Sequence, residues 1–211
     1  MKKNKTILLL VFSVILGTGC SNDNEPSTSN QSITTAGILS GTISNYNAGT
    51  LNELKFGDLF KDNNIISTCA ISSDGKFSMT LPVPTKKLVS GTTKFPGASL
   101  SNPKLQMGAG CVMSLPMAYK TSSWIGYICR SDTAMDPYSP GFIGTSTFYF
   151  YFDRSCTIKG KFDVTTEIWY YDMTVTKGWN EIARTVDSTH CIMYTKTIPS
   201  GLKWYFYKSF N

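Results

Sequence analysis

Apolar and polar residues alternate along several stretches of this chain, with a spacing of two residues. The clearest stretch is 157–164 (TIKGKFDV), in which Ile158, Phe162 and Val164 share one side and polar or charged residues share the other. Residues 76–81 (KFSMTL) repeat the pattern. Because successive side chains of a strand point to opposite faces, both stretches predict strands with one buried face.

Three further stretches are rich in aromatic and β-branched residues, which strands favour. They are 147–152 (TFYFYF), 167–175 (EIWYYDMTV) and 203–207 (KWYFY). Segments with typical turn residues separate the expected strands, namely 45–49 (NYNAG), 73–75 (SDG), 177–178 (KG) and 199–201 (PSG). Many short strands between such turns predict an all-β protein with an antiparallel β-sandwich fold. The one helix candidate is 51–60 (LNELKFGDLF), in which Gly57 is unfavourable.

The segment from Pro82 to Pro103 contains four prolines and two glycines. It predicts a linker or crossover over 83–104, between an N-terminal β unit, 33–82, and a C-terminal β unit, 105–211. A chain of about 50 residues is small for an independent core without disulfides or metals. We therefore expect the two units to pack against each other.

The N-terminus combines a basic start with a short apolar stretch. Lys2, Lys3 and Lys5 precede residues 7–16 (ILLLVFSVIL). Ten helical residues span about 15 Å, which is half of the roughly 30 Å hydrocarbon core of a bilayer. The stretch is therefore too short for a permanent membrane span and indicates a secretory signal.

Residues 17–20 (GTGC) follow this stretch and resemble the lipobox of bacterial lipoproteins. The resemblance implies that residues 1–19 are removed as a signal peptide and that Cys20 is lipidated, which attaches the protein to a membrane. An ordinary signal peptide with an incidental cysteine is the alternative. Residues 21–31 (SNDNEPSTSNQ) contain no hydrophobic residue, so we expect a flexible tether over 20–32.

Asp23 and Glu25, close behind Cys20, resemble the acidic export signal of Bacteroidota surface lipoproteins. The resemblance implies an outer-membrane protein exposed at the cell surface, and the periplasmic face of that membrane is the alternative. Loss of the signal peptide also removes three lysines and lowers the formal net charge from +6 to +3. The longest run of basic residues that remains is Lys86-Lys87, so we expect no nucleic-acid partner.

Residues 39–43 (LSGTI) and 71–82 (ISSDGKFSMTLP) resemble the carboxypeptidase-regulatory-like, or prealbumin-like, β-sandwich modules. In these modules a first strand leads to a hairpin with an Asp-Gly turn and alternating apolar residues. They serve mostly as stalks and adaptors, so the resemblance, which covers about 39–82, implies a non-catalytic role. In the C-terminal unit, residues 174–182 (TVTKGWNEI) resemble a hairpin of uncharacterised secreted β proteins.

Candidate catalytic residues are sparse. His190 is the only histidine, which excludes metal sites built from several histidines. Its neighbour Cys191 would face the other side of a strand, so the two form no expected catalytic pair. The carboxylates that could serve a glycosidase are scattered, and their spacing selects no pair. They are Asp132, Asp136, Asp153, Asp163, Glu167, Asp172 and Glu181. We expect no catalytic residue, no metal site and no cofactor, and enzymatic activity is left open.

Five cysteines follow Cys20 in the sequence, and the compartment implied by export permits disulfides. Cys111 and Cys129 flank one strand–turn–strand stretch and are the candidate disulfide pair. An odd number leaves at least one thiol unpaired within the chain. Cys156 shares a face with Ile158 and is expected in the core.

Aromatic side chains occupy both faces of the 147–152 strand. The phenylalanines share one face, which we assign to the core, and Tyr149 and Tyr151 share the other. Aromatic rings stack on sugars, so Tyr149, Tyr151 and Trp179 are candidate ligand-stacking residues. The alternative is that the other β unit covers this face.

Taken together, these features predict a lipid-anchored protein of the cell envelope. The leading interpretation is a non-catalytic binding or structural module with a glycan or protein partner. Two alternatives are a carbohydrate-active enzyme on surface polysaccharide and a toxin-immunity or inhibitor lipoprotein.

Overall fold

The computed structural model describes residues 37–58, 64–84, 88–108, 115–164 and 166–208. The predicted signal peptide, Cys20 and the tether lie outside these residues. Within them the chain folds almost entirely as strands, which confirms the all-β prediction. No helix of the described part is long and apolar enough to cross a membrane.

The elements follow one another as a series of strands with one short helix. The first elements are β1 (Ile38–Thr42), β2 (Glu53–Asp58), β3 (Asn64–Ala70), β4 (Lys76–Thr80), β5 (Val89–Ser90), α1 (Gly91–Lys94), β6 (Ala98–Leu100) and β7 (Gln106–Gly108). The remaining ones are β8 (Met117–Lys120), β9 (Ser123–Ser131), β10 (Gly144–Phe152), β11 (Cys156–Val164), β12 (Glu167–Val175), β13 (Gly178–Val186), β14 (Cys191–Thr195) and β15 (Lys203–Lys208).

These strands form a small sheet and a large one. β1 and β4 pair with each other, and the large sheet has the order β3-β2-β8-β9-β10-β13-β14-β12-β11-β6. β15 pairs with β9, β7 with β10, and β5 with β7. Strands β12 and β14 run parallel, and the other described ladders are antiparallel.

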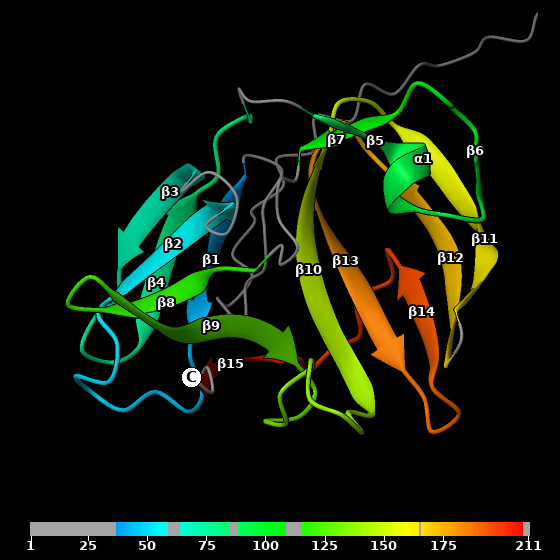
Figure 1. Ribbon diagram of the computed structural model, residues 1–211. Helices are drawn as coiled ribbons and strands as arrows, with labels where there is room; N and C mark the ends of the chain where they lie inside the picture. Colours follow the sequence, from blue (N-terminus) through cyan, green and yellow to red (C-terminus); the bar gives the residue numbers. More distant parts are fainter. Residues whose placement is uncertain (1–36, 59–63, 85–87, 109–114, 165, 209–211) are drawn as a thin grey trace, which may run out of the picture.

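The large sheet bends so that two lobes form (Figure 1). In the left lobe, β1 and β4 pack over the first strands of the large sheet. β4 alternates between exposed and buried residues, with Phe77 and Met79 inside, as its sequence predicts. The ring of buried Trp204 meets Phe77 edge-on at a centroid distance of 5.0 Å. Gly41 is required beside it, because a Cβ there would lie 2.2 Å from Trp204 Nε1.

The right lobe contains β10 to β14 with β5 to β7 and α1 (Figure 1). The stretch 157–164, with the clearest alternation, lies in β11, where Ile158 is fully buried. Cys156 is buried beside it, as expected. The core of this lobe includes Phe152 and Ile182 from β10 and β13, so these two strands contribute to both lobes through their opposite faces.

The helix expected over 51–60 is wrong, because β2 occupies the middle of this segment. Leu54 and Phe56 are buried, and Glu53 and Lys55 share the other face, where they form an ion pair of 3.2 Å. β2 pairs with β3 on one side and with β8 on the other. Two partner strands satisfy its backbone and bury one face, and this outweighs local helix propensity.

All four predicted turn segments contain turns or bends, but the two that were expected within hairpins join strands that do not pair with each other. The Ser73–Gly75 turn connects β3 to β4, and these lie in different sheets, since β3 pairs with β2 and β4 with β1. The Lys177–Gly178 turn connects β12 to β13, and β14 is inserted between these strands. Turn residues set where the chain reverses, but they do not choose the partner of each strand. Both predicted hairpins are therefore wrong in their pairing.

The two β units of the sequence share a sheet and a core. β2 pairs with β8, and the core of the left lobe combines Leu39 and Phe77 with Ile128 and Trp204. The 83–104 segment reaches the right lobe, where β5 pairs with β7 and β6 with β11. The lobes therefore do not coincide with the units, because β8, β9 and β15 pack with the N-terminal strands.

Candidate functional site

The expected ligand-stacking face is buried between the lobes. Tyr149 is 1% exposed and Tyr151 is 7% exposed. Tyr149 stacks on Trp204 at a centroid distance of 5.9 Å, and Tyr151 meets Trp179 edge-on at 5.7 Å. Half-buried Trp179 donates from Nε1 to the Pro82 carbonyl oxygen, 3.1 Å away. A sugar platform needs open ring faces, so the prediction of one on these residues is wrong. Residues of both β units cover them, since Tyr149 packs in one core with Leu39 and Trp204. The alternative, cover by the other β unit, therefore applies in part.

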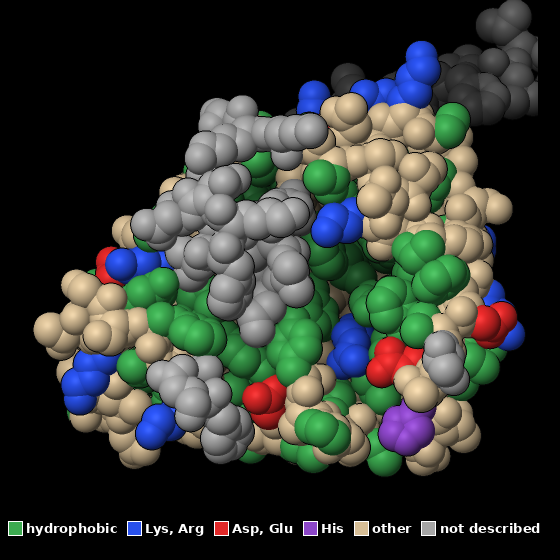
Figure 2. Space-filling view, viewed as in Figure 1, with side chains coloured by type: hydrophobic (Ala, Val, Ile, Leu, Met, Phe, Trp, Pro, Cys, Tyr) green, Lys and Arg blue, Asp and Glu red, His purple; other side chains and the backbone are tan. Residues whose placement is uncertain are grey.

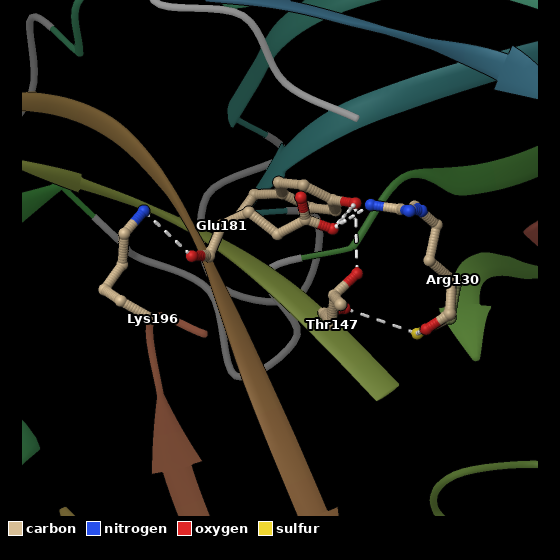
Figure 3. Close-up of polar contacts among 6 residues, drawn as sticks. Arg130, Thr147, Glu181 and Lys196 are labelled. Atoms are coloured by element: carbon tan, nitrogen blue, oxygen red, sulfur yellow. Dashed lines mark hydrogen bonds and ion pairs between the residues drawn. The ribbon is translucent and has the colours of Figure 1, made fainter. Parts of the chain in front are cut away.

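The same face of β10 and β13 contains a buried ion pair (Figure 3). Arg130 Nη1 of β9 lies 2.8 Å from Glu181 Oε1 of β13, and these side chains are only 8% and 6% exposed. The Tyr149 hydroxyl donates to the same Oε1 at 3.0 Å, and the Thr147 hydroxyl lies 3.1 Å from that of Tyr149. The Lys196 ammonium donates to the Glu181 carbonyl oxygen at 3.1 Å. We call these five residues the Arg130 cluster.

The Arg130 cluster is structural in character, because four of its five residues are buried and Lys196 is partly buried. Its carboxylate is matched by a guanidinium, and burial raises the pKa of Tyr149 well above its usual value. Burial also lowers the pKa of Lys196. Arg130 Nε is one of four buried side-chain atoms of the described residues that have no hydrogen-bond partner. Since removing charges from water is costly, such a pair is stable only while both partners are present. The cluster ties together β9, β10, β13 and the residue that follows β14.

Cys129, next to Arg130, is a free and fully buried thiol. It donates to the Thr147 carbonyl oxygen at 3.3 Å. This contradicts the predicted disulfide between Cys129 and Cys111, and Cys111 itself lies outside the described residues. Burial raises the pKa of the Cys129 thiol to about 12, so the thiol is protonated at neutral pH and unreactive.

The best candidate for a ligand site is a groove of about 450 Å³ at the lower end of the right lobe. It lies between the 137–142 loop, the start of β12, the end of β13 and the β13–β14 turn. Its lining residues are Pro137, Tyr138, Ser139, Pro140, Gly141, Phe142, Thr166, Glu167, Arg184, Val186 and His190. Figure 2 shows the single histidine, in purple, at the lower right of the molecule. We call this site the Arg184 groove.

The floor of the Arg184 groove is apolar and well packed. Phe142 and Val186 are buried and form a small cluster with Ile192 of β14. Trp169 and Tyr194 pack against this cluster from β12 and β14. A floor fixed in this way gives the polar side chains of the walls a rigid support.

Local hydrogen bonds shape the loop that forms one wall. Asp132 accepts from the Thr145 N–H at 2.8 Å. Asp136 accepts from the Tyr138 N–H at 2.8 Å and also from the Tyr127 hydroxyl. Aspartates that accept from nearby main-chain N–H groups are typical of tight turns. They hold the Tyr138 ring edge-on to Tyr127 at 5.7 Å, and 42% of Tyr138 stays exposed.

The turn between β13 and β14 forms another wall. Asp187 Oδ1 accepts from the Thr189 N–H, the Thr189 hydroxyl and the Cys191 N–H at 2.8, 2.7 and 3.0 Å. These bonds lower the pKa of Asp187, and the Thr189 hydroxyl is the largest cause. The turn places His190 in the left-handed region, with φ of 59°. His190 therefore lies on an exposed turn at the edge of the groove, and not within a strand as expected.

Two opposite charges line the groove without pairing with each other. Arg184 Nη1 donates to the Pro137 carbonyl oxygen at 3.2 Å. Glu167 Oε2 accepts from Trp169 Nε1 at 2.8 Å. Each contact uses part of the hydrogen-bonding capacity of its group, because a guanidinium has five donors and a carboxylate has about four acceptor positions. Both groups can therefore still bind a ligand.

Arg184 differs from the other two arginines of the sequence. Arg130 pairs with Glu181, and Arg154 pairs with Asp153 at 2.6 Å. Arg184 forms no ion pair with any carboxylate of the described residues. A cation that lines a groove and has no ion-pair partner among the described residues is a natural site for an anionic group.

Most of the scattered carboxylates are engaged away from the groove. Four of them form ion pairs: Asp163 with Lys161, Asp172 with Lys159, Asp153 with Arg154, and Glu181 with Arg130. Asp132 and Asp136 accept hydrogen bonds from main-chain N–H groups near their own loop. Among the lining residues, Glu167 is the one carboxylate, whereas a glycosidase uses two. In the part of the chain that the structure describes, no three His, Cys, Asp or Glu side chains gather to hold a metal ion.

Sequence reasoning missed Arg130 and Arg184. The signal for both was an arginine inside an apolar strand, in ICRS at 128–131 and in IART at 182–185. A charge in such a position needs a partner or an opening to solvent. Which of the two applies depends on the strand pairing, and that was not readable from the local sequence.

Comparisons with known proteins add no relative to this picture. No family model, no curated protein and no solved structure matches the chain.

Proposed function

We propose that this chain is a lipid-anchored, non-catalytic binding protein of the cell envelope that holds a polar ligand in the Arg184 groove. The observation that carries the proposal is the pair Arg184 and Glu167. The two groups line one groove, they are not paired with each other, and each keeps hydrogen-bonding capacity.

The design of the groove supports a binding role. Ligand sites commonly combine an apolar surface with a few polar groups held in fixed positions. Phe142 and Val186 supply the apolar floor. The hydrogen bonds of Asp136 and Asp187 fix the two walls, so a ligand would meet a site that is already formed.

The anchor is supported by the N-terminal sequence. A basic start, a short apolar stretch and Cys20 after small residues match the order expected of a bacterial lipoprotein signal. The polar segment 21–31 would hold the folded part away from the lipid surface, at up to about 35–40 Å when extended.

The groove assignment can be tested by filling it. Thr166 is an exposed residue of the groove wall, so Thr166→Trp should block the groove and leave the core intact. Thr93 is exposed on α1, at the opposite end of the right lobe (Figure 1), and Thr93→Trp is the matched control. The full chain in detergent is applied to glycan and peptide arrays. We expect ligands that the wild type and Thr93→Trp bind and Thr166→Trp does not. Equal binding by Thr166→Trp, or no ligand for the wild type, contradicts the assignment.

The anchor has a separate test. Mass spectrometry of the mature protein should find diacylglyceryl on Cys20 as the first residue, and Cys20→Ser should release the protein from the membrane fraction. An unmodified chain that starts at another residue would contradict the anchor and leave the groove assignment standing.

A further inference from the structure

We infer that the Arg184 groove recognises a carboxylate-bearing saccharide, with Arg184 as the residue that binds the carboxylate. This inference rests on the proposed function of the groove and adds the class of ligand. It follows from the charge of the lining residues, the state of the surrounding strands and the exposed Tyr138 ring.

The charges of the groove favour a singly charged anion. A guanidinium is planar and can donate two parallel hydrogen bonds to a carboxylate. Arg184 is oriented by its bonds to the Pro137 carbonyl oxygen and to the Tyr194 side chain, and it has no carboxylate partner among the described residues. Glu167 lines the same groove and would repel a dianion such as a phosphate monoester. One carboxylate therefore fits better than a phosphate group.

The strands around the groove leave no free edge for an extended peptide. β13 pairs with β10 on one side and with β14 on the other. β12 pairs with β11 and β14. Peptides commonly bind sheets by adding a strand to an open edge, and here those edges are occupied. Recognition must therefore use the side chains, as it does for a sugar.

The remaining lining groups suit the hydroxyls and the ring of a sugar. Glu167 can accept hydrogen bonds from ligand hydroxyls, and the hydroxyl of Thr166 can both donate and accept. The Tyr138 ring is exposed at the groove and is held edge-on against Tyr127 and Phe148, at 5.7 and 6.0 Å. A ring fixed by such contacts offers an apolar surface on which the C–H face of a sugar can stack.

Calorimetry on the full chain in detergent can test the ligand class with paired probes. The acidic probes are trigalacturonate and sialyllactose, and their neutral partners are the methyl ester of trigalacturonate and lactose. A hexaglutamate peptide tests whether a carboxylate is sufficient without a sugar. We expect at least one acidic sugar to bind at least tenfold more tightly than its neutral partner, and the peptide to bind at least tenfold more weakly than that sugar.

Variants of Arg184 test whether this residue binds the carboxylate of the ligand. Arg184→Gln should weaken binding of the acidic sugar at least tenfold and remove the difference from its neutral partner. Arg184→Lys retains the charge and loses the planar fork, so its affinity should lie between the two. Arg154→Gln, in the β10–β11 connection, is the matched control and should bind as the wild type does. Thermal unfolding of each variant checks that the fold is kept, and Arg184→Lys serves if Arg184→Gln does not fold.

Each contrary outcome has its own meaning. Equal binding of acidic and neutral sugars, blocked by Thr166→Trp, overturns the carboxylate inference and leaves the groove as a binding site. Binding of the peptide but of neither acidic sugar overturns the saccharide part. No binding of any probe overturns the inference as a whole, while the array experiment decides the groove assignment independently.

Discussion

β13 carries an acidic residue on one face and a basic residue on the other, and the two meet very different surroundings. Glu181 is buried in the Arg130 cluster, where a guanidinium neutralises it. Arg184, three residues further along, lies on the opposite face of the strand and lines an open groove. Both sites combine Arg, Glu and Tyr side chains. In the Arg130 cluster, burial makes the ion pair structural, because neither charge can lose its partner without a large cost in stability. In the Arg184 groove, access to solvent leaves the charged groups available to a ligand.

The largest effect should come from breaking the buried pair. Glu181→Ala leaves the Arg130 cation buried without a counter-charge, which typically costs about 3–5 kcal/mol of stability. Denaturant unfolding followed by tryptophan fluorescence would measure this loss. Glu167→Ala in the groove is the matched control and should lower the free energy of unfolding by no more than about 1 kcal/mol, since Glu167 is half exposed.

Replacing both partners of the buried pair sharpens the same contrast. The double variant Arg130→Met and Glu181→Met removes both charges, so it should be more stable than Glu181→Ala by about 2 kcal/mol or more. If the double variant is as unstable as the single one, the loss comes from packing and not from an unpaired charge.

Alkaline pH should act on the buried face through Cys129. The thiol of an unfolded chain has a pKa of about 8.5, and burial raises the pKa of Cys129 to about 12 in the folded state. A raised pKa gives stability that is present below the unfolded value and is lost as pH rises toward the folded value. From pH 8.5 to 11, we expect the wild type to lose about 2–3 kcal/mol more than Cys129→Ala does.

Cys69 provides the control for this pH dependence. It is half-buried, and burial raises the pKa of its thiol to about 11. Cys69→Ala should therefore remove a smaller part of the alkaline loss, and this part ends at a lower pH. Identical profiles for the wild type and Cys129→Ala would show that the thiol does not remain protonated inside the fold.

The smallest effect on stability is expected in the groove. Arg184→Gln should change the free energy of unfolding by less than about 1 kcal/mol, because the side chain is half exposed and forms no ion pair. The same denaturant titration measures this change, while binding of the acidic sugar should weaken at least tenfold. A loss above about 2 kcal/mol would make Arg184 a structural residue like Arg130.

The local sequence predicted the strands and turns well and their partners poorly. Alternation in 76–81 and 157–164 correctly identified β4 and β11, and the Asp-Gly and Lys-Gly turns lie where expected. The helix over 51–60 failed because two neighbouring strands stabilise β2. Both hairpins failed because β3 and β4 separate into different sheets, and because β14 enters between β12 and β13.

The candidate site shows the same division. The sequence identified His190 and Glu167 as chemically interesting but not as neighbours, and it missed Arg184. The aromatic face with Tyr149 and Tyr151 was recognised, together with the alternative that the other unit covers it. Only the fold shows that this face is buried and not exposed to solvent. Its burial depends on residues more than 100 positions apart in the sequence, such as Leu39 and Tyr149.

The sequence by itself determined that the chain is built from strands with one apolar and one polar face, since side-chain alternation is a local property of the extended backbone. It also carries the N-terminal pattern that points to Cys20. The tertiary structure decided which faces are covered, which charges are paired and where a groove remains open. These depend on strand pairing between distant segments, and such long-range choices are made by the packing of the whole chain.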